Sequence, residues 1–307
     1  MTYNVHSLLE SYHSEKREIH AEKLHFSGVG DKDVYNITAP FENNGSSIIA
    51  GRVEARDTEH SEVVFFIEEA GEWKPAEGLQ SFYLQDPFVI RIHGQLVFGG
   101  VEIFPHPEKE DALMWRTVFY KGQDVASLKK FAVGPDGMKD IRLVELPDGE
   151  VGVFTRPQGE KGGRGKIGFT SIKSLDQLDE KLLTEAPLIK EHFLDEEWGG
   201  ANEIHILANG WIAGLGHISQ FDNQGDRHYY PITFLFNSEK NEITDMEIIA
   251  VRDDFPPGEA KRPDLKDVLF SGGLVRLKNG KAEIYVGVSD AEAHKAIIPD
   301  PFTKYEN

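Results

Sequence analysis

Hydrophobic positions beyond residue 30 fall into short runs of β-branched and aromatic residues, and turn dipeptides separate these runs. Residues 88–92 with 95–101, and 203–207 with 211–218, are two pairs of runs that each flank one turn. Helical periodicity is scarce in this region, whereas such runs are typical of β-strands joined into hairpins. The pattern therefore predicts an all-β chain.

Five turn dipeptides recur along the chain with strand-like runs beside them. They are Asn44-Gly45, His93-Gly94, Asp148-Gly149, Asn209-Gly210 and Asn279-Gly280. The intervals between successive turn glycines lengthen gradually along the chain, and each interval suits one four-stranded unit with variable loops. We therefore predict a single domain over residues 1–307, an all-β, five-bladed β-propeller with short peripheral helices.

Three segments depart from the strand pattern. Residues 1–22 can form an amphipathic N-terminal helical extension, and residues 174–183 can form a second helix that opens with a capping pair of Ser174 and Gln177. Residues 253–267 are rich in proline and charge. We expect them to form a long loop near a rim, where binding loops often lie.

A second regularity concerns polar residues at fixed distances from the turns. Eight or nine positions before the turn glycines stand Asn36, Asp86, Asp140, Asn202 and Ser271, and seven positions after three of them stand Arg52, Arg156 and His217. At about 3.3 Å per strand residue, both offsets lead to the end of the hairpin opposite its turn. The spacing predicts that these side chains share one mouth of the propeller. The alternative is that small polar residues simply begin strands and cations decorate strand ends.

The charge balance narrows the choice of ligands. The 52 acidic and 33 basic residues give a net charge of -19, which argues against nucleic-acid partners and anionic membrane surfaces. An anionic ligand such as phosphate would need a local cluster of cations. The absence of cysteine excludes disulfides and thiolate metal sites. No apolar run has the length of a membrane span or a signal-peptide core, so we expect a cytoplasmic protein.

Motifs from several predicted blades point to one family. They are Gly51-Arg52-Val53-Glu54, Gln85-Asp86-Pro87-Phe88, Lys139-Asp140-Ile141-Arg142-Leu143, Phe154-Thr155-Arg156-Pro157, Gly199-Gly200-Ala201-Asn202, Gly216-His217 and the run ending in Val288-Ser289-Asp290. Over residues 35–302 the chain resembles the five-bladed β-mannoside phosphorylases of glycoside hydrolase family 130. It resembles more closely the family formerly called DUF1861, now glycosyltransferase family 108. Gln85, Phe88 and Thr155 depart from the family motifs, and prolines of its fourth-blade loop are missing.

The resemblance implies roles for the residues at this mouth. Asp86 corresponds to the aspartate that protonates the leaving oxygen, in some members through a substrate hydroxyl. The matching cations and their neighbours imply a phosphate site of Arg52, Lys139, Arg156, His217 and Tyr229. Taken singly, Asp86 can instead cap a strand before Pro87, each cation can be an ordinary ion-pair residue, and His217 can be a satisfied core histidine.

Further polar residues are candidates for sugar binding, because carboxylate and amide oxygens accept hydrogen bonds from hydroxyls. Asp290 and Asp140 belong here, although either can cap a strand, and Asn36 and Asn202 share their register. Glu203 stands in the fourth-blade loop, where a carboxylate can activate water. The loop at residues 159–168 contains a G-x-G-x-x-G match that precedes a strand-like run, so it does not indicate a dinucleotide site. Its basic residues can lie in solvent or contact the diphosphate of a nucleotide sugar.

The residues and the resemblance together imply an inverting β-1,2-mannoside phosphorylase or mannosyltransferase. Its substrates would be β-mannooligosaccharides with phosphate or α-mannose 1-phosphate, and members of the closer family also use GDP-mannose. Phosphate serves as a co-substrate, the mechanism requires no metal or other cofactor, and a homo-oligomer is compatible with the sequence. The alternatives are an inverting glycosidase that uses water, with Glu203 or another carboxylate as base, and a sugar-binding propeller without catalysis.

Overall fold

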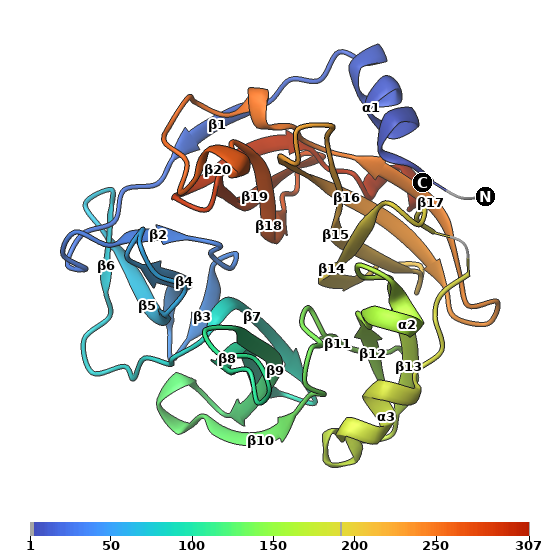
Figure 1. Ribbon diagram of the computed structural model, residues 1–307, viewed down its shortest axis with the longest axis horizontal. Coiled ribbons are helices and arrows are strands. Elements are labelled where there is room, and N and C mark those ends of the chain that lie inside the picture. The colour runs from blue at the N-terminus through green and yellow to red at the C-terminus, as the bar shows by residue number, and fades with distance from the viewer. Residues whose placement is uncertain (1–2, 191, 307) are drawn as a thin grey trace.

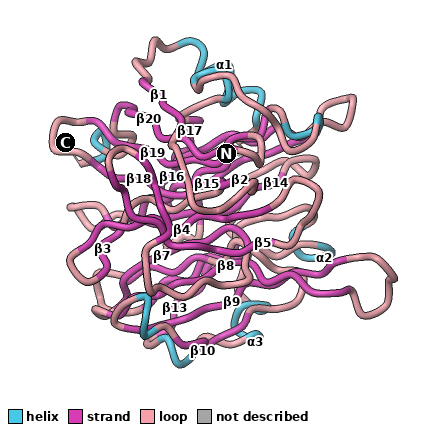
Figure 2. Tube along the Cα trace, turned by 90° about the vertical axis from the view of Figure 1, so that its left-hand side faces the viewer, coloured by secondary structure: helices cyan, strands magenta, loops and turns pink. Residues whose placement is uncertain are grey.

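The computed structural model describes residues 3–190 and 192–306. Its strands form four sheets of five, four, three and eight strands, which stand around a common centre in a ring and are antiparallel except at one pairing in the largest sheet. Figure 1 shows this ring face-on. Figure 2 shows it from the side, with α1 (Val5–Ser14) and α3 (Glu180–Glu185) at opposite edges of the molecule. The all-β, propeller-like arrangement agrees with the hydrophobic pattern.

The first three sheets follow one another along the chain. The five-stranded sheet contains β2 (Asp33–Tyr35), β3 (Phe41–Asn43), β4 (Ser46–Glu54), β5 (Ser61–Glu69) and β6 (Glu72–Pro75). The four-stranded sheet contains β7 (Gln85–Ile92), β8 (Gln95–Pro105), β9 (Leu113–Gly122) and β10 (Lys129–Val133). The three-stranded sheet contains β11 (Arg142–Glu145), β12 (Val151–Thr155) and β13 (Gly168–Ile172).

The eight-stranded sheet consists of two antiparallel halves. The first half contains β14 (Trp198–Ile206), β15 (Ile212–Phe221), β16 (Arg227–Asn237) and β17 (Glu242–Ile248). The second half contains β18 (Asp267–Arg276), β19 (Lys281–Val288), β20 (Glu292–Pro299) and β1 (His20–Lys23). A short parallel pairing of His228 with Asp267 and of Tyr229 with Val268 joins the halves.

All five predicted turns join paired strands. Four lie within or beside the hairpins β7–β8, β11–β12, β14–β15 and β18–β19, and Asn44-Gly45 joins β3 to β4. Asn44 and His93 have φ values of 50°, as have many first residues of tight hairpin turns. In this way the turns fix the register of the strands that lead to the opposite end of each hairpin.

Hydrophobic side chains fill the space between neighbouring sheets. Phe65 of β5 packs with Phe98 of β8, and Phe119 of β9 belongs to a cluster with Val153 of β12. The same kind of cluster joins each remaining neighbour, including one that contains both Val53 of β4 and residues of β19 and β20. Each fully buried side chain of this size contributes about 1.5–3 kcal/mol, so packing between sheets stabilises the ring.

The N-terminal strand β1 closes the ring from the outside. It pairs antiparallel with β20, so that residues from the two ends of the chain belong to the same sheet, as the blue and red strands of Figure 1 show. Lys23 adds an ion pair of 2.6 Å with Glu292. Strands near the two ends of the chain are thus held in one sheet.

Two expected helices are shorter than the sequence suggested. The N-terminal helix ends at Ser14, because the following segment extends and enters β1, so the prediction of a helix over 1–22 was wrong in its second half. Residues 1–2 of that segment lie outside the described residues. The 174–183 helix is a 3-10 turn at Leu175–Gln177 followed by α3, whose cap is Asp179, and Ser174 makes no capping bond. Another short helix, α2, spans Gly159–Gly162.

The remaining short elements are 3-10 turns, at Val125–Ser127, Arg252–Asp254, Pro263–Leu265 and Thr303–Tyr305. Two of them interrupt the proline-rich segment at residues 253–267, which is a loop as expected until β18 begins at Asp267. None of the helices in the described part of the chain combines the length and the apolar character that a bilayer crossing requires.

Candidate functional site

The strand nearest the centre of each sheet is interrupted at the same level. Asn36, Asp86 and Asp140 have φ values of 45°, 48° and 58°, and bulges displace the register between Gln85 and Phe88 and around Asn202. Aspartate and asparagine tolerate the left-handed conformation better than most residues. A bulge turns a side chain out of the regular ladder and toward a site. The sequence regularity therefore reflects one repeated break in the inner strands.

A cavity of about 570 Å³ opens where these breaks converge. Nine of the eleven residues predicted for the site line it: Asn36, Arg52, Asp86, Lys139, Asp140, Arg156, His217, Tyr229 and Asp290. Asn202 and Glu203 do not line it.

Asp86 lies at the base of the cavity in a dense polar network. Its Oδ1 accepts hydrogen bonds from Asn36 Nδ2 at 2.8 Å and from Arg52 Nη1 at 3.1 Å. Burial alone would raise the pKa of this carboxyl, but Arg52 and Lys139, helped by Asn36, outweigh burial and hold the pKa below its ordinary value. Asp86 is therefore a carboxylate with these neighbours at neutral pH.

Arg52 is held from both sides. Glu54 Oε2 accepts bonds from its Nε at 3.0 Å and Nη2 at 2.6 Å, and its guanidinium lies 4.8 Å from the centre of the Tyr35 ring. Burial lowers the pKa of Arg52, but Asp86, Tyr35 and Glu54 outweigh burial and raise it, so the cation is permanent. The bonds to Glu54 thus fix the orientation of the guanidinium.

Asp140 and Arg156 form a second buried pair, with 3.4 Å between Oδ2 and Nη1. Burial would raise the pKa of Asp140, but Arg156 and Lys139 lower it to about 2. Arg156 Nε donates to the carbonyl of Gly199 at 2.8 Å, whereas Arg156 Nη1 and Asp140 Oδ1 are buried without a hydrogen-bond partner within the described chain. Unsatisfied buried polar atoms are rare and mark groups that a ligand can satisfy.

Glycine at position 165 permits this placement of Arg156. A Cβ atom at 165 would lie 2.6 Å from Arg156 Nη2, and the residue has a φ of 143°. The Gly-rich loop that resembled a nucleotide motif thus packs its backbone against the guanidinium of Arg156.

His217 differs from the other predicted phosphate ligands because it is uncharged. Burial, with Arg156 and Lys139 nearby, lowers the pKa of His217 to about 3, although Asp140 acts in the opposite direction. The expectation that His217 serves as a cation is wrong in these surroundings. The neutral ring stacks on Tyr229 at 5.6 Å between centres and can still exchange a hydrogen bond with a ligand.

Asn202 acts on the site through His217. Its Oδ1 lies 2.8 Å from His217 Nδ1, while Asn202 Nδ2 is buried without a partner within the described chain. Amide oxygen and nitrogen are assigned from such networks, and the exchanged orientation would place Nδ2 on His217 Nδ1. His217 would then carry its proton on Nε2. Asn202 therefore decides which ring nitrogen of His217 donates.

Glu203 lies away from the cavity. Its Oε2 accepts the backbone N–H of Leu274 at 2.7 Å and contacts His205 Nε2 at 3.2 Å. Asn202 contacts His217, whereas Glu203 contacts Leu274 and His205, so these two consecutive residues at the register shift of β14 have different partners. The structure gives Glu203 a role between β14 and β18.

Lys139 and Asp290 complete the part of the lining that the sequence predicted, here called the inner cavity. Lys139 is half-buried and makes no ion pair within the described chain, yet it acts on the charges of Asp86, Asp140 and Asp290. Burial and the nearby Asp86 raise the pKa of Asp290, against the effect of Arg52. Two aspartates with oppositely shifted pKa values therefore face one cavity, an arrangement suited to acid–base chemistry.

Another part of the lining, here called the outer cavity, contains residues that the turn spacing did not predict: Glu59, Trp115, Gln158, Arg164, Trp198, Phe221, Arg227 and Arg262. Arg164 stacks on Trp198 and Phe221, with 5.6 and 4.8 Å to the ring centres. Trp198 Nε1 donates to the Tyr229 hydroxyl at 3.0 Å. Arg164 belongs to the Gly-rich basic loop and Arg262 to the proline-rich loop, so loop composition was the available signal.

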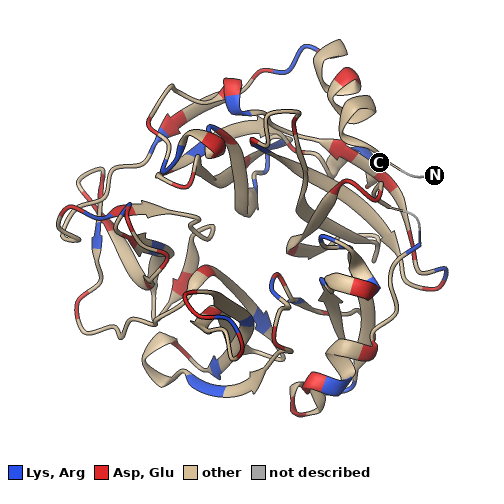
Figure 3. Cartoon of the chain, viewed as in Figure 1, with Lys and Arg blue, Asp and Glu red and all other residues tan. Residues whose placement is uncertain are grey.

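The charge of the cavity lining is opposite in sign to the net charge of the chain. Its lining contains six arginine or lysine side chains and four aspartate or glutamate side chains, although the net charge is -19. Figure 3 shows that acidic and basic residues occur in every part of the ring, so the excess of cations is a local feature. An anionic ligand can be bound here.

Comparison with known proteins places this site in a family. Residues 11–304 match the family described as "Protein of unknown function (DUF1861)". MPT-4 of Leishmania mexicana, a mannose phosphorylase solved with a phosphate ion, is 34% identical with a TM-score of 0.89, over 98% of this chain and 94% of that chain. MPT-1 of the same organism, a GDP-Man-dependent mannosyltransferase, is 32% identical with a TM-score of 0.87, over 97% and 95%.

The fold extends to more distant proteins. The β-1,2-mannobiose phosphorylase of Listeria innocua has a TM-score of 0.63 at 12% identity, over 93% of this chain and 92% of that chain. A search of curated proteins gave no significant match. The family match over most of the chain, together with the two Leishmania relatives, confirms the resemblance inferred from the motifs: the chain belongs to the DUF1861 family and is a carbohydrate-active enzyme.

Proposed function

We propose that this chain is an inverting β-1,2-mannoside phosphorylase that transfers mannose reversibly between a β-mannooligosaccharide and phosphate. We also propose that residues 1–307 form one five-bladed propeller, in which the two halves of the eight-stranded sheet count as separate blades. The relatives MPT-4 and the Listeria enzyme, described as phosphorylases, support the activity. The observation that carries it is the buried Asp86 carboxylate in contact with Arg52, in a cavity that Arg156 also lines, whose Nη1 forms an ion pair with Asp140 but makes no hydrogen bond within the described chain.

The phosphate site would consist of Arg52, Lys139 and Arg156, with His217 and Tyr229 as neutral donors. Two guanidinium groups suit the tetrahedral oxygens of phosphate, and neither can lose its charge in a protein. Phosphate is already an anionic nucleophile and needs only to be held in line with the anomeric carbon. A second catalytic carboxylate is then unnecessary.

In phosphorolysis, a phosphate oxygen forms the new bond to the anomeric carbon from the face opposite the leaving oxygen. The glycosidic bond breaks, and the leaving oxygen takes its proton from Asp86, directly or through a sugar hydroxyl. The product is α-mannose 1-phosphate. Phosphate bound beside Arg52 and Lys139 would offset part of their charge, which raises the pKa of Asp86 toward the protonated form that this direction needs. In synthesis, the Asp86 carboxylate accepts the proton instead.

The sugar would be bound by the remaining polar residues of the inner cavity. Asn36, Asp140 and Asp290 line it and offer oxygens to hydroxyl groups. Glu203, as a base for water, finds no support, because its carboxylate is bonded to Leu274 and lies outside the cavity lining.

A nucleotide-sugar donor is the second candidate substrate. Arg164, Arg227 and Arg262 line the outer cavity, where they could receive a diphosphate. MPT-1, described as GDP-Man-dependent, supports this alternative. Formation of GDP from GDP-mannose in the presence of a mannooligosaccharide would favour it over phosphorolysis.

The proposal is tested with β-1,2-mannobiose in the presence and absence of phosphate. We expect α-mannose 1-phosphate to form, seen by phosphorus NMR, and no cleavage without phosphate. Equal cleavage without phosphate, with free mannose as the product, would show hydrolysis. Asp86→Asn should reduce kcat by about 10²–10⁴-fold, the usual contribution of general acid catalysis. Asp176→Asn, at an aspartate whose side chain is 82% exposed, is the matched control and should retain full activity.

A further inference from the structure

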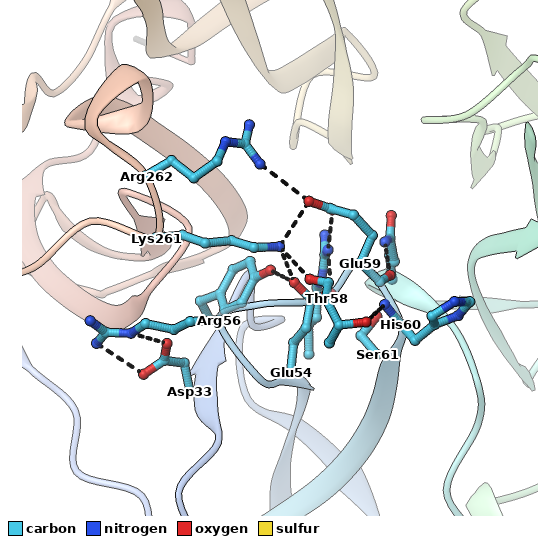
Figure 4. Close-up of polar contacts among 12 residues, drawn as sticks. Asp33, Glu54, Arg56, Thr58, Glu59, His60, Ser61, Lys261 and Arg262 are labelled. Carbon is cyan, nitrogen blue, oxygen red and sulfur yellow. Dashed lines mark hydrogen bonds and ion pairs between the residues drawn. The ribbon is translucent and has the colours of Figure 1, made fainter. Parts of the chain in front are cut away.

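The loop that precedes β18 contacts the loop that follows β4, the strand that contains Arg52 of the proposed phosphate site. Residues 255–266, here called the strap, lie between the 3-10 turn Arg252–Asp254 and β18, and contact the loop that joins β4 to β5. Figure 4 shows Lys261 extending from the strap to Glu54, Thr58 and Glu59. The two segments lie far apart in the sequence, so only the closed ring brings them together.

Lys261 ends in a closed polar pocket. Its side chain is 4% exposed, and its ammonium forms an ion pair with Glu54 Oε1, donates to the Thr58 carbonyl at 2.8 Å and pairs with Glu59 Oε1 at 3.1 Å. All three ammonium hydrogens therefore have an acceptor. Burial of an ammonium group costs free energy unless a nearby negative charge compensates it.

The charge that Lys261 compensates is shared with the catalytic cavity. Glu54 is 1% exposed at its side chain, and its second oxygen, Oε2, accepts both bonds that orient Arg52. Glu54 is thus bound on one oxygen by Lys261 and on the other by Arg52. The hydroxyl of Tyr35 adds a bond of 2.6 Å to Oε1.

The backbone of the strap is anchored beside another site residue. The N–H of Lys261 donates to the carbonyl of Ser289 at 3.0 Å, and Ser289 immediately precedes Asp290. Ser289 and Asp290 have φ values of 54° and 50°, so this turn is held in a conformation that most residues avoid. Lys261 is therefore connected to Arg52 through its side chain and to Asp290 through its backbone.

We propose that Lys261 is a positioning residue for anion binding, which neutralises Glu54 so that the charge of Arg52 remains available to the co-substrate. Without Lys261, Oε1 of Glu54 would keep only the Tyr35 hydroxyl as a partner, and the uncompensated charge of Glu54 beside Arg52 would weaken the attraction of phosphate to the guanidinium. Lys261 itself does not line the cavity. The inference rests on the proposed function in one respect, namely that an anion binds beside Arg52.

The test is a double-mutant cycle on Lys261 and Glu54, read out as the KM for phosphate. Lys261→Met keeps most of the side-chain length and removes the charge. We expect it to raise the KM for phosphate by about ten-fold or more, the size of one lost contact to a charged group. The charge of Lys261 also lowers the pKa of Asp290, less strongly than Arg52 does, so the KM for the mannoside should change by a smaller factor than the KM for phosphate. In a Glu54→Gln background, the same change at Lys261 should leave the KM for phosphate unaffected.

A matched control separates positioning from mere attachment of the strap. Arg56 also joins the two segments, through an ion pair to Glu259 of the strap, and it pairs with Asp33 at 2.7 Å without touching Glu54. Arg56→Met should therefore lower the melting temperature without a selective change in the KM for phosphate. An equal rise in Arg56→Met and Lys261→Met would overturn the inference, as would an equal rise from Lys261→Met in both Glu54 backgrounds.

Two further measurements keep the outcome decisive. If Lys261→Met alone does not fold, the double variant leaves no uncompensated buried charge at this pair, and its comparison with Glu54→Gln alone still gives the effect of Lys261. Calorimetric titration with inorganic phosphate repeats the comparison without turnover. If the unaltered protein shows no phosphate-dependent cleavage, the proposed function is wrong. If Lys261→Met binds phosphate as tightly as the unaltered protein does, the role of Lys261 is wrong.

Discussion

Asp86 and Asp140 occupy equivalent breaks in the inner strands of neighbouring sheets, and each pairs with an arginine, Asp86 with Arg52 and Asp140 with Arg156. Counting from the turn glycines predicted these positions, because hairpin register converts sequence distance into height along the strand. The counting could not predict protonation. The neutral state of His217 depends on burial first and then on Arg156 and Lys139, and the low pKa of Asp140 depends on the same two cations, which approach from different segments.

The pH dependence of stability tests the surroundings of Asp140. Its pKa of about 2 in the folded chain lies below the ordinary value of 3.8, so its ionised form stabilises the fold above about pH 4, and this contribution is lost as the pH falls toward 2. The expected size is roughly 2 kcal/mol. Urea unfolding should show the stability gap between the unaltered protein and Asp140→Asn shrinking by this amount between pH 5 and pH 2. A gap that is constant with pH would contradict the assignment.

Strands and turns were easier to predict than the short helices. The five hairpins follow from local turn chemistry, which acts within a few residues. The helix over 1–22 stops at Ser14 because residues 20–23 find a partner in β20, which lies near the other end of the chain. A pattern within residues 1–22 cannot predict a pairing with a strand so distant in the sequence. The same limit applies to Glu203, because its carboxylate accepts the backbone N–H of Leu274, which lies 71 positions further along the chain in β18.

Removal of β1 should expose an edge and change the state of association. A chain that begins after Lys23 leaves the outer edge of β20 unpaired, and such edges pair with other molecules. A chain that begins after Ser14 loses α1, with its buried Val5, Leu8 and Tyr12, but keeps β1. Both truncations should lower the melting temperature. Only the chain that begins after Lys23 should show concentration-dependent association in sedimentation velocity. Association of both or of neither would indicate that β1 does not protect this edge.

The ring as a whole determines which residues form the site. Arg52, Asp86 and Arg156 come from three different sheets, and the packing between neighbouring sheets holds those sheets in place. The closing contacts of β1 with β20 and of the strap with the β4–β5 loop complete the arrangement. Motif spacing indicated a common mouth, but Lys261 and Arg262 reach Glu59 of the β4–β5 loop only because the ring closes.

The whole molecule also repels the co-substrate that its cavity is proposed to bind. The net charge of -19 acts over long distances, whereas Arg52, Lys139 and Arg156 act at contact distance. The screening length falls from about 30 Å at 0.01 M salt to about 8 Å at 0.15 M, so added salt weakens the distant repulsion more than the buried contacts. The KM for phosphate should therefore fall over this range, measured with a bulky monovalent anion to limit competition, while the KM for the uncharged mannoside stays constant. A KM for phosphate that rises with salt would mean that the cations of the cavity, and not the net charge, dominate the field met by an approaching anion.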